Sequence, residues 1–197
     1  MLTIISLLAS ICLLPVKAHE ITKGSISGYG KVEASADFAV IAFSIESTGA
    51  NRKEANSLLE KSITDIKAAL KDYGSVYGEG YYSYPDLDGN FVSTQNLVIK
   101  TEKLKSLDKI NKILTDNGAV SVCPPCYSVN DGSEWEQKAL KEAIADAKSR
   151  AASVGITTDP SAIKDFGANP YCIYGCTSEN AGKVIFECRV TLFFNDK

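Results

Sequence analysis

The sequence predicts an α+β protein in which antiparallel or mixed sheets pack against three helices. Three segments repeat apolar residues at helical spacing, and each carries a start or stop signal. Other segments alternate apolar with polar residues, or are rich in β-branched and aromatic residues, as strands are. These strands and helices follow one another in mixed order with no low-complexity linker between them, which is the pattern of an α+β fold.

The first two predicted strands are residues 24–34 and 37–47. Gly28 and Gly30 in the first strand suggest a phosphate-binding loop, but a dinucleotide fingerprint needs a helix directly after its glycines. A second strand follows here instead. We therefore reject a dinucleotide site.

Two helices come next in the prediction, each with end signals. Asn51 begins the first helix, and Glu54 lies three residues later, as in a capping box. Gly74 is expected to end this helix in the left-handed conformation. The second helix spans 106–117 and stops at Gly118.

A hairpin is predicted between these two helices. Its arms, 76–84 and 91–101, flank a dense turn signal. Tyrosine rings combine an apolar body with a polar tip, and the first arm holds four of them: Tyr77, Tyr81, Tyr82 and Tyr84. They form either a binding face or, as the pattern favours, one side of an amphipathic strand that packs within its own sheet.

A strand at 119–129 and a long helix follow the hairpin and second helix. Pro124-Pro125 removes two ladder donors, so the strand must be an edge, bulged or broken there. Ser133 and Glu136 have capping-box spacing at the start of the helix, which ends at Gly155. Its narrow face of small residues allows this chain's sheet or a neighbouring subunit to approach closely. That face holds Ala139, Leu140, Ala143, Ile144, Ala147, Ala151 and Val154.

The last part of the chain is predicted to be irregular over 157–183 and to end in a strand, 184–194. One face of that strand is uniformly apolar and includes Cys188. We therefore expect Cys188 to face the core.

The first 18 residues have the pattern of a secretory signal peptide. Their apolar run is too short to span a bilayer, which takes about 20 residues, and Val16 and Ala18 suit the positions before a cleavage site. The sequence therefore predicts cleavage after Ala18 and a periplasmic or secreted product, residues 19–197. No later segment reaches transmembrane length. The net charge is −3 without a Lys/Arg block, which argues against a nucleic-acid partner.

Three stretches resemble the SIMPL-domain family of bacterial envelope proteins. In the first, residues 26–40, a glycine-rich strand precedes an apolar one. In the second, residues 82–99, the stretch Tyr82-Ser-Tyr-Pro85 leads into the hairpin. The third, residues 138–155, is an alanine-rich helix with an internal Asp146-Ala147 pair. Their order agrees with the family over 24–195. Ala36 stands where the family usually has proline.

The resemblance implies a SIMPL-like α+β domain over 19–197, with an alternative division into two subdomains of about 24–118 and 119–197. The family includes a periplasmic oxidative-stress-defence protein and an envelope protein that assembles into large rings. It therefore implies a homo-oligomer and a role in envelope or oxidative stress defence. It supplies no catalytic residues, and its members do not depend on the cysteines found here.

The predicted mature chain keeps an odd number of cysteines: Cys123, Cys126, Cys172, Cys176 and Cys188. Export favours disulfides, so at most two intrachain bridges form and one thiol stays free or pairs between chains. The preferred pairing joins the 123/126 loop to the 172/176 loop. Two alternatives remain, a Cys123/Cys126 thiol–disulfide oxidoreductase and a zinc site formed by the first four cysteines.

Few residues are available for other chemistry. The single histidine, His19, rules out a nucleophile pair built on imidazole, although as a new N-terminus it could bind copper. The acidic pairs Asp86/Asp88 and Asp131/Glu134 suit turns and helix starts. The first turn resembles a calcium loop but lacks the closing glutamate.

The sequence therefore predicts an exported, non-enzymatic protein of the envelope or periplasm, without a cofactor, that is oligomeric and acts through its surfaces. The alternatives are the thiol–disulfide oxidoreductase and the zinc- or copper-binding module described above.

Overall fold

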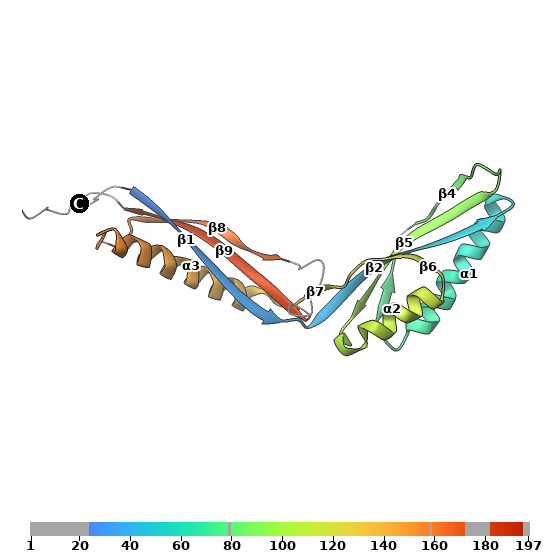
Figure 1. Ribbon diagram of the computed structural model, residues 1–197, viewed down its shortest axis with the longest axis horizontal. Coiled ribbons are helices and arrows are strands. Elements are labelled where there is room, and N and C mark those ends of the chain that lie inside the picture. Colours follow the sequence, from blue (N-terminus) through green and yellow to red (C-terminus); the bar gives the residue numbers. More distant parts are fainter. Residues whose placement is uncertain (1–23, 79, 158, 172–181, 195–197) are drawn as a thin grey trace, which may run out of the picture.

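The computed structural model describes residues 24–78, 80–157, 159–171 and 182–194. It confirms the α+β class: the described residues form two antiparallel sheets and three α-helices. The two sheets lie end to end in an elongated molecule, and each has helices on one side (Figure 1). We call the two halves the first lobe and the second lobe.

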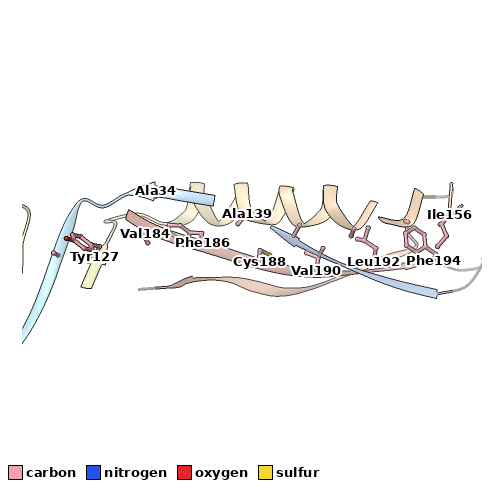
Figure 2. Packing of buried hydrophobic residues seen from close by; sticks show 14 residues of the cluster. Ala34, Tyr127, Ala139, Ile156, Val184, Phe186, Cys188, Val190, Leu192 and Phe194 are labelled. Carbon is pink, nitrogen blue, oxygen red and sulfur yellow. The ribbon is translucent and has the colours of Figure 1, made fainter. Parts of the chain in front are cut away.

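The first lobe is a three-stranded sheet with one helix across it. Its strand order is β1-β9-β8. The strands are β1, Gly24–Ser35; β8, Ala162–Tyr171; and β9, Lys183–Phe194. Helix α3, Ser133–Ser153, covers one face of this sheet. Its core lies between α3 and the sheet, from Tyr127 at one end to Ile156 and Phe194 at the other (Figure 2). Cys188 is buried in this core, as predicted.

The second lobe is a six-stranded sheet with two helices on one face. Its main path is β3-β5-β2-β6, and β4 also pairs with β5 and β7 with β2. The strands are β2, Phe38–Gly49; β3, Ser75–Tyr77; β4, Tyr82–Pro85; β5, Phe91–Thr101; β6, Ala119–Val122; and β7, Cys126–Ser128. The helices are α1, Arg52–Leu70, and α2, Leu107–Asp116, after the short 3-10 turn η1, Leu104–Ser106. Leu59, Ile66 and Leu97 are among its fully buried core residues.

The two lobes do not divide the chain near residue 118. β1 pairs with β9 along its whole length, from Gly24 opposite Phe194 to Ser35 opposite Lys183. The first strand therefore belongs with the C-terminal part of the chain, and the subdomains of about 24–118 and 119–197 are not the two cores that form. The second lobe is the continuous one, since its strands and helices all fall between Phe38 and Ser128.

The predicted helices form, but two of their end signals work differently. Asn51 caps α1 as expected, with its side chain accepting a hydrogen bond from the Glu54 amide at 3.0 Å. Gly74 is not left-handed; a Cβ there would lie 2.2 Å from the Lys100 carbonyl oxygen, so glycine is needed for close packing. At the start of α3 the Asp131 carboxylate, not a Ser133 cap, accepts from the amide and hydroxyl of Ser133. These bonds hold the pKa of Asp131 below its ordinary value.

One predicted break is confirmed, and the strands differ from the prediction in two places. Pro124-Pro125 breaks the 119–129 strand into β6 and β7, as the missing donors require. The first hairpin arm is likewise two pieces, β3 and β4. The irregular segment predicted over 157–183 is wrong in part, because β8 pairs antiparallel with β9 there. The β8 sequence lacks a clear alternation of apolar and polar residues and contains Gly167 and Pro170, so it does not have the usual pattern of a strand.

Candidate functional site

The helix α3 docks on β1 through glycines facing alanines. A Cβ on Gly28 would lie 2.1 Å from the Ala143 carbonyl oxygen, and one on Gly30 would lie 2.0 Å from the Ala139 carbonyl oxygen. Both distances are far inside van der Waals contact, so only glycine lets the helix come this close. The element that approaches the small-residue face is therefore this chain's own sheet. Val154, placed on that face by the sequence, is exposed.

Two carboxylates of α3 also hold the outer edge of β1. The Tyr29 amide donates to Asp146 Oδ2 at 2.9 Å, and the Lys31 amide donates to Glu142 Oε2 at 3.3 Å. β1 is an edge strand, whose unpaired amides would otherwise be open to another chain. Asp146 also pairs with Arg150 at 2.9 Å. The Tyr29 bond, followed by Arg150, lowers the pKa of Asp146.

This carboxylate makes the stability of the first lobe depend on pH. Because the pKa of Asp146 is lower in the folded chain, its contribution is present above the pKa of the unfolded chain and is lost as the pH falls through the folded value. We expect Asp146→Asn to reduce the drop in Tm between about pH 7 and about pH 3, around the ordinary pKa near 4. Thermal unfolding followed by circular dichroism checks this.

Asp65→Asn, on the exposed side of α1, is the matched control and should leave that pH dependence unchanged. An identical pH dependence in Asp146→Asn and the wild-type chain would contradict this role for the carboxylate.

The helix-free face of the six-stranded sheet carries the exposed tyrosines. Tyr77, Tyr82 and Tyr84 lie opposite Val98, Thr94 and Val92 in the antiparallel register, and paired residues project to the same face. The alternate residue Ser83 instead faces α1, where its hydroxyl donates to Asn56 Oδ1 at 2.6 Å. The tyrosines therefore lie on the side away from α1 and α2. We call the surface formed by Tyr77, Tyr82, Tyr84 and their neighbours on these strands the tyrosine face.

The tyrosine rings are available to solvent. Tyr77 is 55% exposed and Tyr82 is 59% exposed, and the Tyr82 and Tyr84 rings stack with centroids 6.2 Å apart. Packing within their own sheet, the interpretation that the sequence favoured, does not account for this exposure. Tyr81 and Leu87, in the neighbouring loops, are exposed as well.

A shallow groove of about 210 Å³ lies on the tyrosine face. It is lined by β2, β5 and β6 together with Tyr77 and Gly78, and the Cys123 side chain is part of its wall. A Cβ on Gly78 would lie 2.9 Å from the Asn96 carbonyl oxygen and 2.3 Å from a Leu97 methyl carbon, so a side chain here would force its neighbours to shift. No local sequence pattern predicts this groove, because its lining comes from segments far apart along the chain.

A family model matches most of these elements. Residues 25–159 match SIMPL, described as a protein of unknown function (DUF541). The chain belongs to the SIMPL family. No curated protein matches it. No helix in the described ranges is both long and apolar enough to cross a bilayer.

The SIMPL match includes both partners of the glycine–alanine contact, β1 and α3, and the whole tyrosine face. It ends before β8 and β9, although β9 completes the first lobe by pairing with β1. The sequence resemblance was expected over 24–195, and the family model covers 25–159 of that range. Cys123 and Cys126 fall inside this range, and Cys172, Cys176 and Cys188 fall beyond it.

The described cysteines lie in different environments. Cys123 has a free, exposed thiol, whereas Cys126 is disulfide-bonded, so the two are not bonded to each other. Cys172 and Cys176, the partners that the sequence favours, lie outside the described residues, as does His19. Strand β7 begins at Cys126 and α3 only at Ser133. The strand, Cys-x-x-Cys and helix order of a thioredoxin-like site is therefore not formed here.

The acidic residues that the sequence singled out act in turns and at a helix start. Asp86 Oδ1 accepts from the amides of Asp88 and Asn90, at 2.9 and 2.8 Å, which closes the hairpin turn. Asp131 caps α3, and Glu134 pairs with Lys138 one turn along the helix. Within the described ranges, no three His, Cys, Asp or Glu side chains come together as a metal site.

Proposed function

We propose that this SIMPL-family protein is an exported, non-enzymatic protein of the envelope or periplasm that self-associates through its tyrosine face. The observation that carries the proposal is the exposure of Tyr77, Tyr82 and Tyr84 on one side of a sheet whose other side is covered by helices. Tyrosine is enriched at protein interfaces because its ring is apolar and its hydroxyl tolerates water. A second copy of this chain is the occupant that the family resemblance implies.

The geometry of the face suits association. Tyr82 and Tyr84 are two residues apart on an edge strand, so their rings project together and present one stacked surface. The groove, which is lined in part by Tyr77, adds a concave surface on the same face. An interface formed over this face buries aromatic side chains, which carry most of the binding free energy in many complexes.

Self-association is tested with residues 19–197 by gel filtration with light scattering over a range of concentrations. We expect an oligomer for the wild-type chain and a shift to monomer in the double variant Tyr82→Ser, Tyr84→Ser. Losing one interface hot spot costs about 2 kcal/mol or more, which weakens association roughly thirtyfold.

Tyr29→Ser is the matched control, since Tyr29 is an exposed tyrosine on the other lobe. It should leave the oligomer unchanged. A wild-type chain that remains monomeric at every concentration contradicts self-association, and an oligomer that survives the double variant places the interface elsewhere.

Export and a structural disulfide belong to the same proposal. The signal-peptide pattern of the first 18 residues and the bonded state of Cys126 support an oxidising compartment. The bridge that we propose joins Cys126 to Cys172 or Cys176 and stabilises the folded chain by about 2–4 kcal/mol. Intact mass of the protein recovered from its cell fraction decides this, since cleavage after Ala18 leaves His19 as the first residue.

A role in envelope or oxidative stress defence is part of the proposal because the family resemblance implies it. The oxidoreductase and metal-binding alternatives have less support. The helix that would stabilise a thiolate does not follow Cys126 directly, and Cys126, which a zinc site would need as a thiolate ligand, is disulfide-bonded.

A further inference from the structure

We propose that Cys123 is an exchange thiol, which displaces the present disulfide partner of Cys126 and forms a Cys123–Cys126 bridge. The inference rests on the structural disulfide of the proposed function and adds a reactive site to it. Its starting observation is that a free, exposed thiol lies three residues from a bonded sulfur.

The sheet register places both cysteines on one face. The Cys123 amide donates to the Ala42 carbonyl oxygen at 2.8 Å, and Cys126 lies opposite Val40 in the β2–β7 pairing. Val40 and Ala42 are two residues apart on β2, so their side chains point to the same side of the sheet. That side is the helix-free one, where Cys123 lines the groove.

The spacing is compatible with a disulfide between them. Two residues along a strand span roughly 6.8 Å, and the Cα atoms of bonded cysteines lie about 4.4–6.8 Å apart. The pair is therefore at the upper end of the bonding range, and a small closing movement of the chain suffices. Pro124 and Pro125 lie between them and have no amide hydrogens, so the movement breaks no ladder bond donated by either residue.

The reaction is balanced within the chain. The Cys123 thiol loses its proton, and the thiolate attacks the Cys126 sulfur. The bond between Cys126 and its present partner breaks, and the partner sulfur leaves as a thiolate that takes up a proton. One disulfide and one thiol are present before and after the step, so no outside oxidant or reductant is needed. The result is a chain in which Cys126 no longer holds its former partner.

The exchange is measured by mapping disulfides in the oxidised full chain. The protein is held at about pH 8, which favours the thiolate as nucleophile, then acid-quenched, alkylated and digested with trypsin. Cleavage after Lys112 and Lys138 yields one peptide with both Cys123 and Cys126. Before exchange this peptide is alkylated at Cys123 and cross-linked through Cys126. After exchange it is a single peptide with an internal disulfide, carries no alkyl group, and is two hydrogens lighter than the reduced peptide.

We expect the internally bridged peptide in the wild-type chain, in larger amounts at about pH 8 than at about pH 5, because the thiolate is the nucleophile. It should disappear in Cys123→Ser. The matched control is Cys123→Ser combined with Ser121→Cys, which keeps a thiol on the same groove wall. Ser121 lies opposite Ser44, four residues or roughly 13 Å from Val40, so this thiol should not exchange.

Three results would overturn the proposal. The first is a wild-type chain with only the cross-linked peptide at both pH values. The second is equal exchange by the thiol at position 121, which would show that sheet geometry does not direct the reaction. The third is Cys126 alkylated in the oxidised chain, which also removes the structural disulfide. The first two leave that disulfide and the self-association intact.

Discussion

Gly28→Ala should prevent α3 from docking on β1. The added Cβ would lie 2.1 Å from the Ala143 carbonyl oxygen and 2.5 Å from the Ala147 amide nitrogen. Both atoms are backbone, so no change of side-chain rotamer relieves the clash, and the helix must move off the strand. Overpacking of a core typically costs about 1–3 kcal/mol. A clash with backbone lies at or beyond the top of that range, and we expect the first lobe to lose most of its stability.

Urea unfolding followed by tryptophan fluorescence measures this loss, because the single tryptophan, Trp135, packs against the core of the first lobe. Ser25→Ala, an exposed position on the same strand, is the control and should unfold like the wild type. Adding Ala143→Gly to Gly28→Ala should not restore stability, because the carbonyl oxygen remains. Rescue by Ala143→Gly, or a stable Gly28→Ala chain, would show that the helix does not need this contact.

Leu59→Ala and Leu192→Ala should each destabilise one lobe. Both leucines are fully buried, Leu59 in the core of the second lobe and Leu192 in that of the first. Truncating a buried leucine to alanine costs about 2–5 kcal/mol. The two leucines lie in separate clusters, which meet where Leu107 packs against both and where Ala39 and Tyr127, from strands of the second lobe, join the core of the first. We therefore expect the cost to appear mainly in the lobe that holds the changed residue.

Amide hydrogen exchange separates the lobes. In Leu59→Ala, protection should fall in α1, β2 and β5 and remain in α3 and β9, and Leu192→Ala should show the reverse. Each variant serves as the control for the other. Equal loss of protection throughout the chain in both variants would mean that the lobes unfold as one cooperative unit.

The sequence was sufficient for the elements whose signals are local. Helix α1 has Asn51 at its start and buried residues at Ala55, Leu59, Ile63, Ile66 and Leu70, and both features can be recognised without any partner. The break at Pro124-Pro125 follows equally from the missing amide hydrogens. Strand β8 was not predicted because it lacks clear alternation and contains Gly167 and Pro170, so only its pairing with the next strand, β9, defines it.

The candidate site was harder to predict because it depends on contacts between segments that are far apart along the chain. Four tyrosines in one arm were visible, but their exposure depends on Ser83, which takes the inward position on β4 and bonds to Asn56. The contact between Gly28, Gly30 and α3 does have a signal in the sequence. Two glycines one strand repeat apart match alanines one helical turn apart, and such a pair of small-residue patterns indicates close packing between them. The second role of Asp146, at the edge of β1, had no such signal.

The connection of the first lobe also limits when it is able to form. β1 begins at Gly24 and its partner β9 ends at Phe194, so contacts such as Ser27 with Thr191 join residues 164 positions apart. The other sheet is complete once Ser128 has been made. During synthesis β1 therefore emerges long before its partner exists, and its ladder stays unpaired until β9 follows. Closing so long a loop is slow. Of the strands in the described ranges, β1 is the one that must stay unpaired the longest.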